Sequence, residues 1–223
     1  MPVGTDAILL ASWVNLEKSK KILDVGTGSG VVAMIMAHRS AEARIDAIDS
    51  SSEAAALAEK NFLMSPFSHR LNPIQADWRD FAVTGRSTYD IVVSNPPFFE
   101  RSLDPAKESR RRWRHVSGLG FNSLLQGGKD VLVKDGRINM IIPFRESDDV
   151  IEAARSFELQ LRRYCQVIPV SGRPANRIML ELSWSEEDVG PMEKTSLTLR
   201  GVDGQYHTDY LALAGSYYLK PLK

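Results

Sequence analysis

Short apolar runs alternate with segments of helical pattern along the first two thirds of the chain. Helical apolar patterns cover residues 31–38, 52–64 and 119–134, the second capped by Ser52, and the runs that predict strands are residues 21–25, 44–49, 71–77, 89–94 and 137–142. Strands that alternate with helices pair in parallel and are covered by helices on both faces. Pro73 weakens the third run as a strand. The pattern therefore predicts an α/β fold.

The last third of the chain departs from this alternation. After a helical pattern at 148–157, the extended runs 159–170 and 178–184 are joined by only seven residues, 171–177. That connection is too short for a helical crossover, so these two strands should pair antiparallel. A charged break at 186–188 precedes one more strand, 196–200, and a helix near 209–219. We expect one domain over residues 1–223, with a mostly parallel seven-stranded sheet that ends in an antiparallel hairpin.

Glycine interrupts one of the predicted helices. Gly127 and Gly128 lie within the pattern at 119–134, and each should cost about 1 kcal/mol relative to alanine in a helix. We expect that helix to be broken or to begin late.

Composition limits the class of protein. The 28 basic and 28 acidic residues cancel, so no global field attracts a polyanion. Cys165, the single cysteine, cannot form an internal disulfide, and should be a small buried residue in a strand. No apolar run reaches the ~18 residues that span a bilayer, and the start has no signal-peptide pattern. We expect a cytoplasmic monomer with no metal and no membrane association.

A glycine-rich loop follows the first predicted strand. Asp24 precedes Gly26, Gly28 and Gly30, which let the backbone turn sharply and approach a ligand where the next helix begins. A dinucleotide fingerprint, G-x-G-x-x-G, would need a glycine where Val31 stands. The spacing therefore argues against NAD. The pattern D-x-G-x-G-x-G resembles the first motif of class I S-adenosylmethionine methyltransferases, whose glycines make room for the amino-acid end of the cofactor.

Acidic residues end the next two strands. Asp49 stands where a carboxylate can accept hydrogen bonds from both ribose hydroxyls of an adenosine-type cofactor, although dehydrogenases use the same position. Asp77 stands where the methyltransferase pattern places an acid near the adenine amino group. Trp78 follows it, either against the adenine or in the core.

The fourth strand ends in the sequence Ser-Asn-Pro-Pro-Phe-Phe at 94–99, where open parallel sheets bind ligands. Pro96 and Pro97 remove N–H donors and leave carbonyl acceptors. The Asn95 amide oxygen and the Pro96 carbonyl can together accept both hydrogens of an exocyclic amino group, which turns the nitrogen lone pair toward a methyl sulfonium. Phe98 can stack on the ring that carries the amine. This motif resembles that of methyltransferases acting on conjugated amino nitrogens, which need neither a metal nor a strong base.

Over its whole length the chain is similar to the bacterial valine-tRNA adenine-37 N6-methyltransferase family. The match rests on residues 3–10, on 95–99 followed by an arginine-rich loop and His115, and on the tyrosine-rich stretch 197–219. The resemblance implies a Rossmann-like class I methyltransferase with a family-specific extension at 185–223. It also implies that Thr5 and Asp6 lie beside the cofactor.

By the same resemblance, the substrate is the adenine next to the anticodon of a valine tRNA, splayed into the pocket. S-adenosylmethionine would be converted to S-adenosylhomocysteine. Two stretches of the chain, 101–114 and 160–177, each carry a local charge of +4. We expect phosphate contacts from Arg101, Lys107, Arg110, Arg111, Arg112, Arg114, Arg162, Arg163 and Arg173. Family members carry a further stretch before residue 4, and its absence should affect affinity rather than fold.

The sequence is also compatible with other functions. A ribosomal-RNA guanine-N2 methyltransferase often continues its motif with histidine, where this chain has Phe99. A glutamine-N5 enzyme would need an additional amino-terminal domain. A non-catalytic subunit that binds S-adenosylmethionine should tolerate loss of Asn95, and a nicotinamide dehydrogenase would be revealed by cofactor titration.

Overall fold

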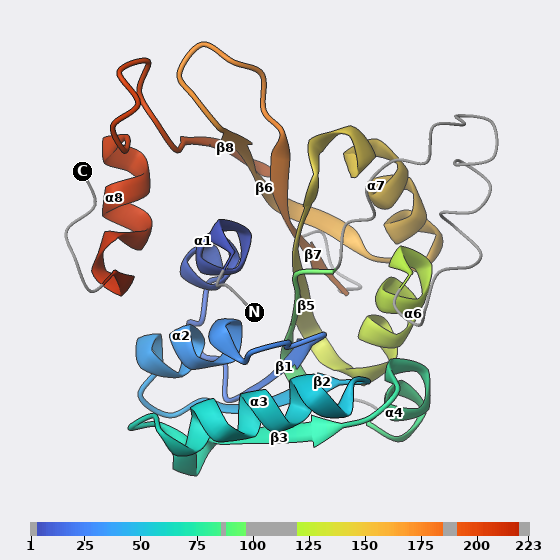
Figure 1. Ribbon diagram of the computed structural model, residues 1–223. Coiled ribbons are helices and arrows are strands. Elements are labelled where there is room, and N and C mark those ends of the chain that lie inside the picture. The colour runs from blue at the N-terminus through green and yellow to red at the C-terminus, as the bar shows by residue number, and fades with distance from the viewer. Residues whose placement is uncertain (1–3, 86–87, 97–119, 185–190, 219–223) are drawn as a thin grey trace.

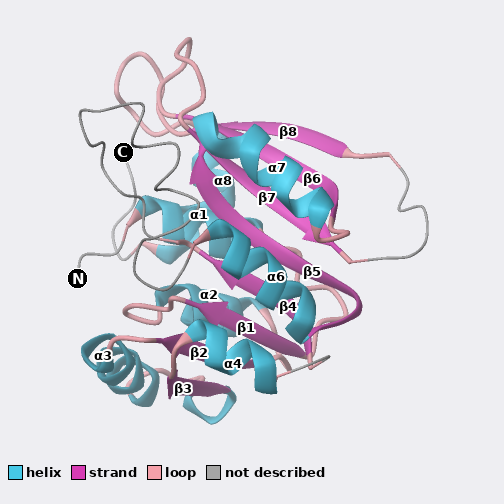
Figure 2. Ribbon diagram, turned by 90° about the vertical axis from the view of Figure 1, so that its right-hand side faces the viewer, coloured by secondary structure: helices cyan, strands magenta, loops and turns pink. Residues whose placement is uncertain are grey.

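The computed structural model describes residues 4–85, 88–96, 120–184 and 191–218 (Figure 1). Within these residues, eight strands form one sheet in the order β3-β2-β1-β4-β5-β7-β6-β8 (Figure 2). The elements in chain order are α1 (Thr5–Trp13), β1 (Lys21–Val25), α2 (Val31–Arg39), β2 (Arg44–Asp49), α3 (Ser52–Leu63), β3 (Leu71–Gln75), α4 (Trp78–Thr84), β4 (Tyr89–Ser94), α6 (Phe121–Val131), β5 (Leu132–Pro143), α7 (Ser147–Ser156), β6 (Gln160–Ile168), β7 (Arg177–Ser183), β8 (Glu193–Thr198) and α8 (Thr208–Ala214).

The sheet is parallel from β3 through β5, and β7 is antiparallel to both of its neighbours. The predicted α/β class and the antiparallel hairpin are therefore confirmed. The predicted number of seven strands is wrong, because β8 adds an eighth strand parallel to β6. With β8 in place, β6 is hydrogen-bonded on both sides and β8 becomes the edge strand, where the exposed charges of Glu193 and Lys194 disfavour pairing with another chain. Pro73 is tolerated because β3 is itself an edge strand.

Two hydrophobic cores lie on opposite faces of the sheet. Helices α1, α2 and α8 lie on one side of the sheet, and α4, α6 and α7 lie on the other (Figure 1). Because side chains alternate along a strand, Ile22 of β1 belongs to the first core and Leu23 to the second. Cys165 is 4% exposed on β6, which confirms its predicted burial in a strand. In the described parts of the chain, no helix has the length and apolar character required to cross a bilayer.

The predicted cap of α3 is wrong by one residue. The side chain of Ser51, not Ser52, caps α3 by accepting a hydrogen bond from the Ala54 amide at 3.3 Å.

The predicted effect of the glycine pair on α6 is also wrong. Helix α6 runs unbroken through both glycines, against the expectation of a break or a late start. A Cβ atom at Gly127 would lie 2.8 Å from Cζ2 of Trp78, and one at Gly128 would lie 2.6 Å from Cδ1 of Ile138. The two glycines therefore let α6 pack closely on α4 and β5.

We expect Gly127→Ala to lower the free energy of unfolding by up to about 2 kcal/mol. Overpacking against Trp78 and Ala82 should cost roughly 1–3 kcal/mol, and better helix propensity should return about 1 kcal/mol. The Trp78 ring cannot easily move aside, because its Nε1 donates to the Ser123 carbonyl at 2.9 Å. Urea unfolding measures the change. Gly215→Ala is the control, because its backbone is helical and an added Cβ would lie no closer than 3.9 Å to Leu211, an ordinary contact distance. A Gly127→Ala variant more stable than the parent would contradict this packing argument.

Candidate functional site

The predicted site residues meet at the carboxyl edge of the parallel strands. The strand order reverses at β1, whose neighbours are β2 and β4, and ligands of open α/β sheets bind at such a switch point. In the register, Val25 of β1 lies beside Ile48 of β2 and Ser94 of β4. The glycine loop, Asp49 and Asn95 therefore follow three adjacent strand ends.

The glycine loop adopts a backbone that only glycine adopts readily. Gly26, Gly28 and Gly30 have φ angles of 74°, 56° and 80°. At Gly30, an added Cβ would also lie 2.4 Å from Cε1 of Phe62. The Gly28 amide donates to Oδ2 of Asp49 at 3.0 Å, which ties the loop to the end of β2. The loop is thus held open at the beginning of α2.

Asp24 is a buried carboxyl group beneath this loop. Its side chain is almost inaccessible to solvent, and its Oδ2 accepts a hydrogen bond from the Thr27 hydroxyl at 2.6 Å. Burial raises the pKa of Asp24 to about 7, although the bond from Thr27 opposes the shift. The group can therefore gain or lose a proton near neutral pH.

The acids that end β2 and follow β3 are both bound to backbone amides. Oδ1 of Asp49 accepts from the Ser51 amide at 3.0 Å, and this half-buried carboxylate keeps further lone pairs for a ligand. Asp77 caps α4, with Oδ1 accepting from the Arg79 amide at 2.8 Å. Trp78 is 4% exposed in the core beneath α6. Of the two readings of Trp78, its burial favours the core, so we leave it out of the proposed cofactor site.

The side-chain oxygen of Asn95 indicates what the site can bind. This Oδ1 atom is buried and has no hydrogen-bond partner among the described residues. The preceding Ser94 is fixed by its hydroxyl, which donates to the Val25 carbonyl at 2.8 Å, and Pro96 is buried. An unsatisfied buried acceptor costs about 1–3 kcal/mol, so it calls for a donor from elsewhere. Pro97 and Phe98 lie outside the described residues.

Helix α1 begins at the same edge of the sheet. Oδ2 of Asp6 accepts a hydrogen bond from Nε of Arg177 at 2.9 Å. Arg177 begins β7 and lies beside Pro143, the last residue of β5. This ion pair therefore places the start of α1, with Thr5 and Asp6, beside the carboxyl end of β5, the strand next to β4.

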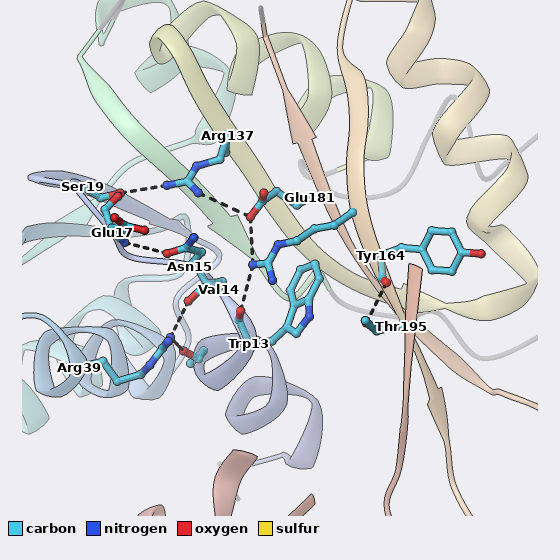
Figure 3. A network of polar contacts seen from close by, with 12 residues as sticks. Trp13, Val14, Asn15, Glu17, Ser19, Arg39, Arg137, Tyr164, Glu181 and Thr195 are labelled. Carbon is cyan, nitrogen blue, oxygen red and sulfur yellow. Dashed lines mark hydrogen bonds and ion pairs between the residues drawn. The ribbon is translucent and has the colours of Figure 1, made fainter. Parts of the chain in front are cut away.

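Arg39 and Arg163 bind the other end of α1; Figure 3 labels Arg39 and the partners Trp13, Val14 and Glu181. Nη1 of Arg39 donates to the carbonyls of Ala11 and Val14 at 2.6 and 2.8 Å. Nη2 of Arg163 lies 3.1 Å from both the Trp13 carbonyl and Oε2 of Glu181. These bonds satisfy carbonyls at the end of the helix, so α1 is fixed at both ends. Sequence reasoning missed this arrangement.

The structure separates the basic residues that the sequence had grouped. Arg163 is bound to the end of α1 and to Glu181, which argues against the predicted phosphate contact. Arg162 lies six residues before the end of β6, about 20 Å from the carboxyl edge at 3.3 Å per residue. Arg173 is exposed in the loop between β6 and β7, at the carboxyl edge. Six predicted contacts lie outside the described residues: Arg101, Lys107, Arg110, Arg111, Arg112 and Arg114.

A cavity of about 440 Å³ lies at the opposite edge of the sheet, where β1 and β4 begin. Its lining includes Lys18, Asp90 and Arg137, whose mixed charges favour no class of ligand. Among the described residues, no group of three or more His, Cys, Asp or Glu side chains is arranged to hold a metal ion.

Comparison with known proteins gives a family-model match and close relatives. Residues 3–145 match the model of the methyltransferase small domain. The tRNA1(Val) (adenine(37)-N6)-methyltransferase of Parabacteroides distasonis is 36% identical over 99% of this chain and 92% of its own length. The protein of the same name from Photobacterium profundum is 35% identical, again over 99% of this chain and 92% of its own length.

Solved structures show the same fold at lower identity. The predicted O-methyltransferase of Agrobacterium tumefaciens superposes with a TM-score of 0.74 at 22% identity, covering 93% of this chain and 94% of that one. A SAM-dependent methyltransferase from Aquifex aeolicus gives a TM-score of 0.53 at 11% identity, covering 74% of this chain and 82% of that one. At these identities the likeness concerns the fold alone.

Proposed function

Because the chain belongs to the tRNA1(Val) (adenine(37)-N6)-methyltransferase family, we propose that it transfers a methyl group from S-adenosylmethionine to N6 of adenine 37 in a valine tRNA. The observation that carries the proposal is the buried, unpartnered Oδ1 of Asn95 at the switch point of the sheet. An exocyclic amino group is a donor that would satisfy this atom. The same position at a sheet edge with a glycine loop suits an adenosine-type cofactor.

The residues at the strand ends fit S-adenosylmethionine. Gly26, Gly28 and Gly30 would leave room for its amino-acid end. Asp49 would accept hydrogen bonds from the ribose hydroxyls, and Asp77 would lie near the adenine. The buried carboxyl of Asp24 suits the ammonium group, with Thr5 and Asp6 closing the site from α1. When bound, the cofactor supplies a methyl group on a positively charged sulfur.

Catalysis in this proposal is mainly positioning. Oδ1 of Asn95 accepts one hydrogen of the adenine amino group and the Pro96 carbonyl accepts the other. These two bonds orient the nitrogen lone pair toward the methyl group. After attack the nitrogen would be cationic and its proton would pass to solvent water, so no strong base is needed. Pro97 and Phe98, which lie outside the described residues, would restrict the backbone of the motif and stack on the adenine, respectively.

The adenine must leave its loop to reach these atoms, as bases do in enzymes that modify them. The basic residues of the segment 101–114 and Arg173 would bind the phosphates of the anticodon stem-loop. We propose one methyltransferase domain over 1–223, with 185–223 as its extension, acting as a monomer in the cytoplasm on tRNA.

The affinity for S-adenosylmethionine should fall as the pH drops below 7. The ammonium group needs the carboxylate form of Asp24, whose pKa is raised to about 7 by burial. Above pH 7 the carboxylate is already present. Below pH 7, Asp24 must lose a proton before it can bind the ammonium group, so the affinity falls about tenfold for each further pH unit. Calorimetry at pH 6 and pH 8, in two buffers of different ionisation enthalpy, counts the protons released. Asp24→Asn should bind weakly and lose the pH dependence, and a parent Kd that is equal at both pH values would contradict this role.

Methyl transfer with labelled S-adenosylmethionine tests the proposed function. The substrates are an unmodified valine tRNA, the same tRNA with guanine at position 37, and ribosomal RNA, each followed by nucleoside digestion and mass analysis. We expect N6-methyladenosine from the first tRNA only. N2-methylguanosine in ribosomal RNA would show that the proposed substrate is wrong but that methyl transfer to an amino nitrogen is right. Cofactor binding without transfer to any RNA would point to a non-catalytic subunit.

A further inference from the structure

The carboxyl edge of the sheet continues beyond the parallel strands. Arg177 of β7 lies beside both Pro143, the end of β5, and Val167 near the end of β6. Ile168 and Thr198, the last residues of β6 and β8, are also paired. The loops 169–176 and 199–207 therefore project from the same edge as the glycine loop and Asn95. They lie side by side in both ribbon views (Figures 1 and 2).

Hydrogen bonds join these two loops. The Ser171 amide donates to the Arg200 carbonyl at 2.8 Å. Within the second loop, Arg200 and Tyr206 form an isolated antiparallel bridge, and the Gly201 amide donates to the Gln205 carbonyl at 2.9 Å. The backbone around Arg200 is therefore well defined.

The side chain of Arg200 is also fixed. Its guanidinium carbon lies 3.9 Å from the centre of the Tyr206 ring, and its Nη1 donates to the Gly204 carbonyl at 2.6 Å. Tyr206 stacks in turn on Tyr210, with ring centres 5.3 Å apart and planes at 22°. Tyr210 is fully buried on α8. An aromatic stack anchored in the core thus holds this cation at the edge of the sheet.

The charge of Arg200 is not neutralised within the described chain. No ion pair there involves Arg200, or Arg173 on the adjoining loop. Two carboxylates of the same segment have partners of their own: Asp203 accepts from the Gln205 amide, and Asp209 lies 3.2 Å from Nδ1 of His207. Two guanidinium groups therefore lie on joined loops at the same edge of the sheet as the site, with Arg173 exposed and Arg200 partly exposed.

We propose that Arg200 and Arg173 form a phosphate-binding surface that holds the RNA strand beside the splayed base. The inference rests on the proposed function and adds Arg200, which lies in the extension, to the RNA contacts. A planar guanidinium binds phosphate oxygens in a fixed fork, and one that is already oriented loses less side-chain entropy on binding. Tyr206 is a positioning residue, because it acts through Arg200.

Salt-dependent binding of valine tRNA tests this surface, with the full chain and S-adenosylhomocysteine present. Arg200→Ala and Arg173→Ala should each weaken binding about tenfold at 0.15 M salt. Each should also lower the slope of log Kobs against log[salt] by about 0.7–0.9, the value for one lost phosphate contact. Tyr206→Leu keeps the charge, so its affinity should fall while the slope changes little. In methylation assays the loss from Arg200→Ala should raise KM for tRNA rather than lower kcat.

Arg44→Ala is the matched control, because it removes one exposed arginine at the start of β2, on the opposite edge. Binding by Arg200→Ala and Arg173→Ala equal to that of Arg44→Ala would overturn the proposal. Arg173 is exposed in a loop, so its variant reports on binding even if Arg200→Ala folds poorly. If the parent methylates valine tRNA but these slopes are unchanged, only this inference fails. If the parent methylates no tRNA while the slopes change, the proposed function fails and the RNA-binding surface stands.

Discussion

Replacing Asn95 by alanine is expected to lower kcat for tRNA methylation at least about 100-fold, while the Kd for S-adenosylmethionine stays within about twofold. The amide oxygen is the buried acceptor that fixes the amino group, and a misplacement of about 1 Å in a positioned reaction costs on the order of 100-fold. Single-turnover methyl transfer gives the rate, and calorimetry gives the cofactor affinity. The rate should fall without a matching change in affinity.

Two variants sharpen the comparison. Asn95→Asp keeps an acceptor oxygen in a side chain of the same shape, so it should retain more activity than Asn95→Ala. Asn139 is a second buried asparagine whose amide atoms lack partners in the described structure, on the neighbouring strand β5 beside Val93. Asn139→Ala should therefore change stability but leave kcat near that of the parent. If Asn95→Ala is as active as the parent, the amino group is held by other atoms and the mechanism is wrong.

The parallel part of the fold follows from local patterns in the sequence. Apolar runs that alternate with helical segments specify β1 through β5, and the short connection between β6 and β7 specifies an antiparallel pair. The place of β8 could not be predicted in this way. Four of its six residues, from Glu193 to Ser196, are exposed, so no apolar pattern marks it as part of the sheet. Its backbone pairing with β6 is what holds it there.

The site was predictable where it depends on strand ends. Asp24, Asp49 and Asn95 lie within or just beyond neighbouring parallel strands, so their proximity follows from the strand order. The role of Arg163 could not be predicted, because its partner carbonyl on Trp13 is 150 residues away in sequence. A basic stretch such as 160–177 is only a sum of charges. In the structure Arg163 binds the end of α1, Arg162 lies on β6 far from the carboxyl edge, and Arg173 is exposed in a loop.

Glycine patterns illustrate the same limit. Gly26, Gly28 and Gly30 were interpretable because a turn after a strand requires left-handed backbone, and all three have positive φ. The sequence does not explain Gly127 and Gly128, because helix propensity predicts only that they destabilise a helix. Their advantage is the space they leave for Trp78 and Ile138, which approach from other elements.

Replacing Asp49 by alanine is expected to weaken the binding of S-adenosylmethionine about 10- to 100-fold. Hydrogen bonds to a charged group contribute about 1.5–3 kcal/mol, which corresponds to a loss of this size when the ribose loses its acceptor. The carboxylate also accepts from the amides of Gly28 and Ser51, so Asp49→Ala could act by loosening the loop. Asp49→Asn keeps an acceptor oxygen for only one of these two amides and removes the charge, and should weaken binding nearly as much.

A double-mutant cycle separates the two causes. S-adenosylhomocysteine and its 2′-deoxy analogue are titrated into the parent and into Asp49→Asn, and the four Kd values give the coupling between the carboxylate and the hydroxyl. If Asp49 binds the ribose, the analogue should lose affinity for the parent but little further affinity for the variant. If Asp49 only orders the glycine loop, the two losses should add. Additive losses would remove Asp49 from the cofactor contacts and leave it as a positioning residue of the Gly28 amide.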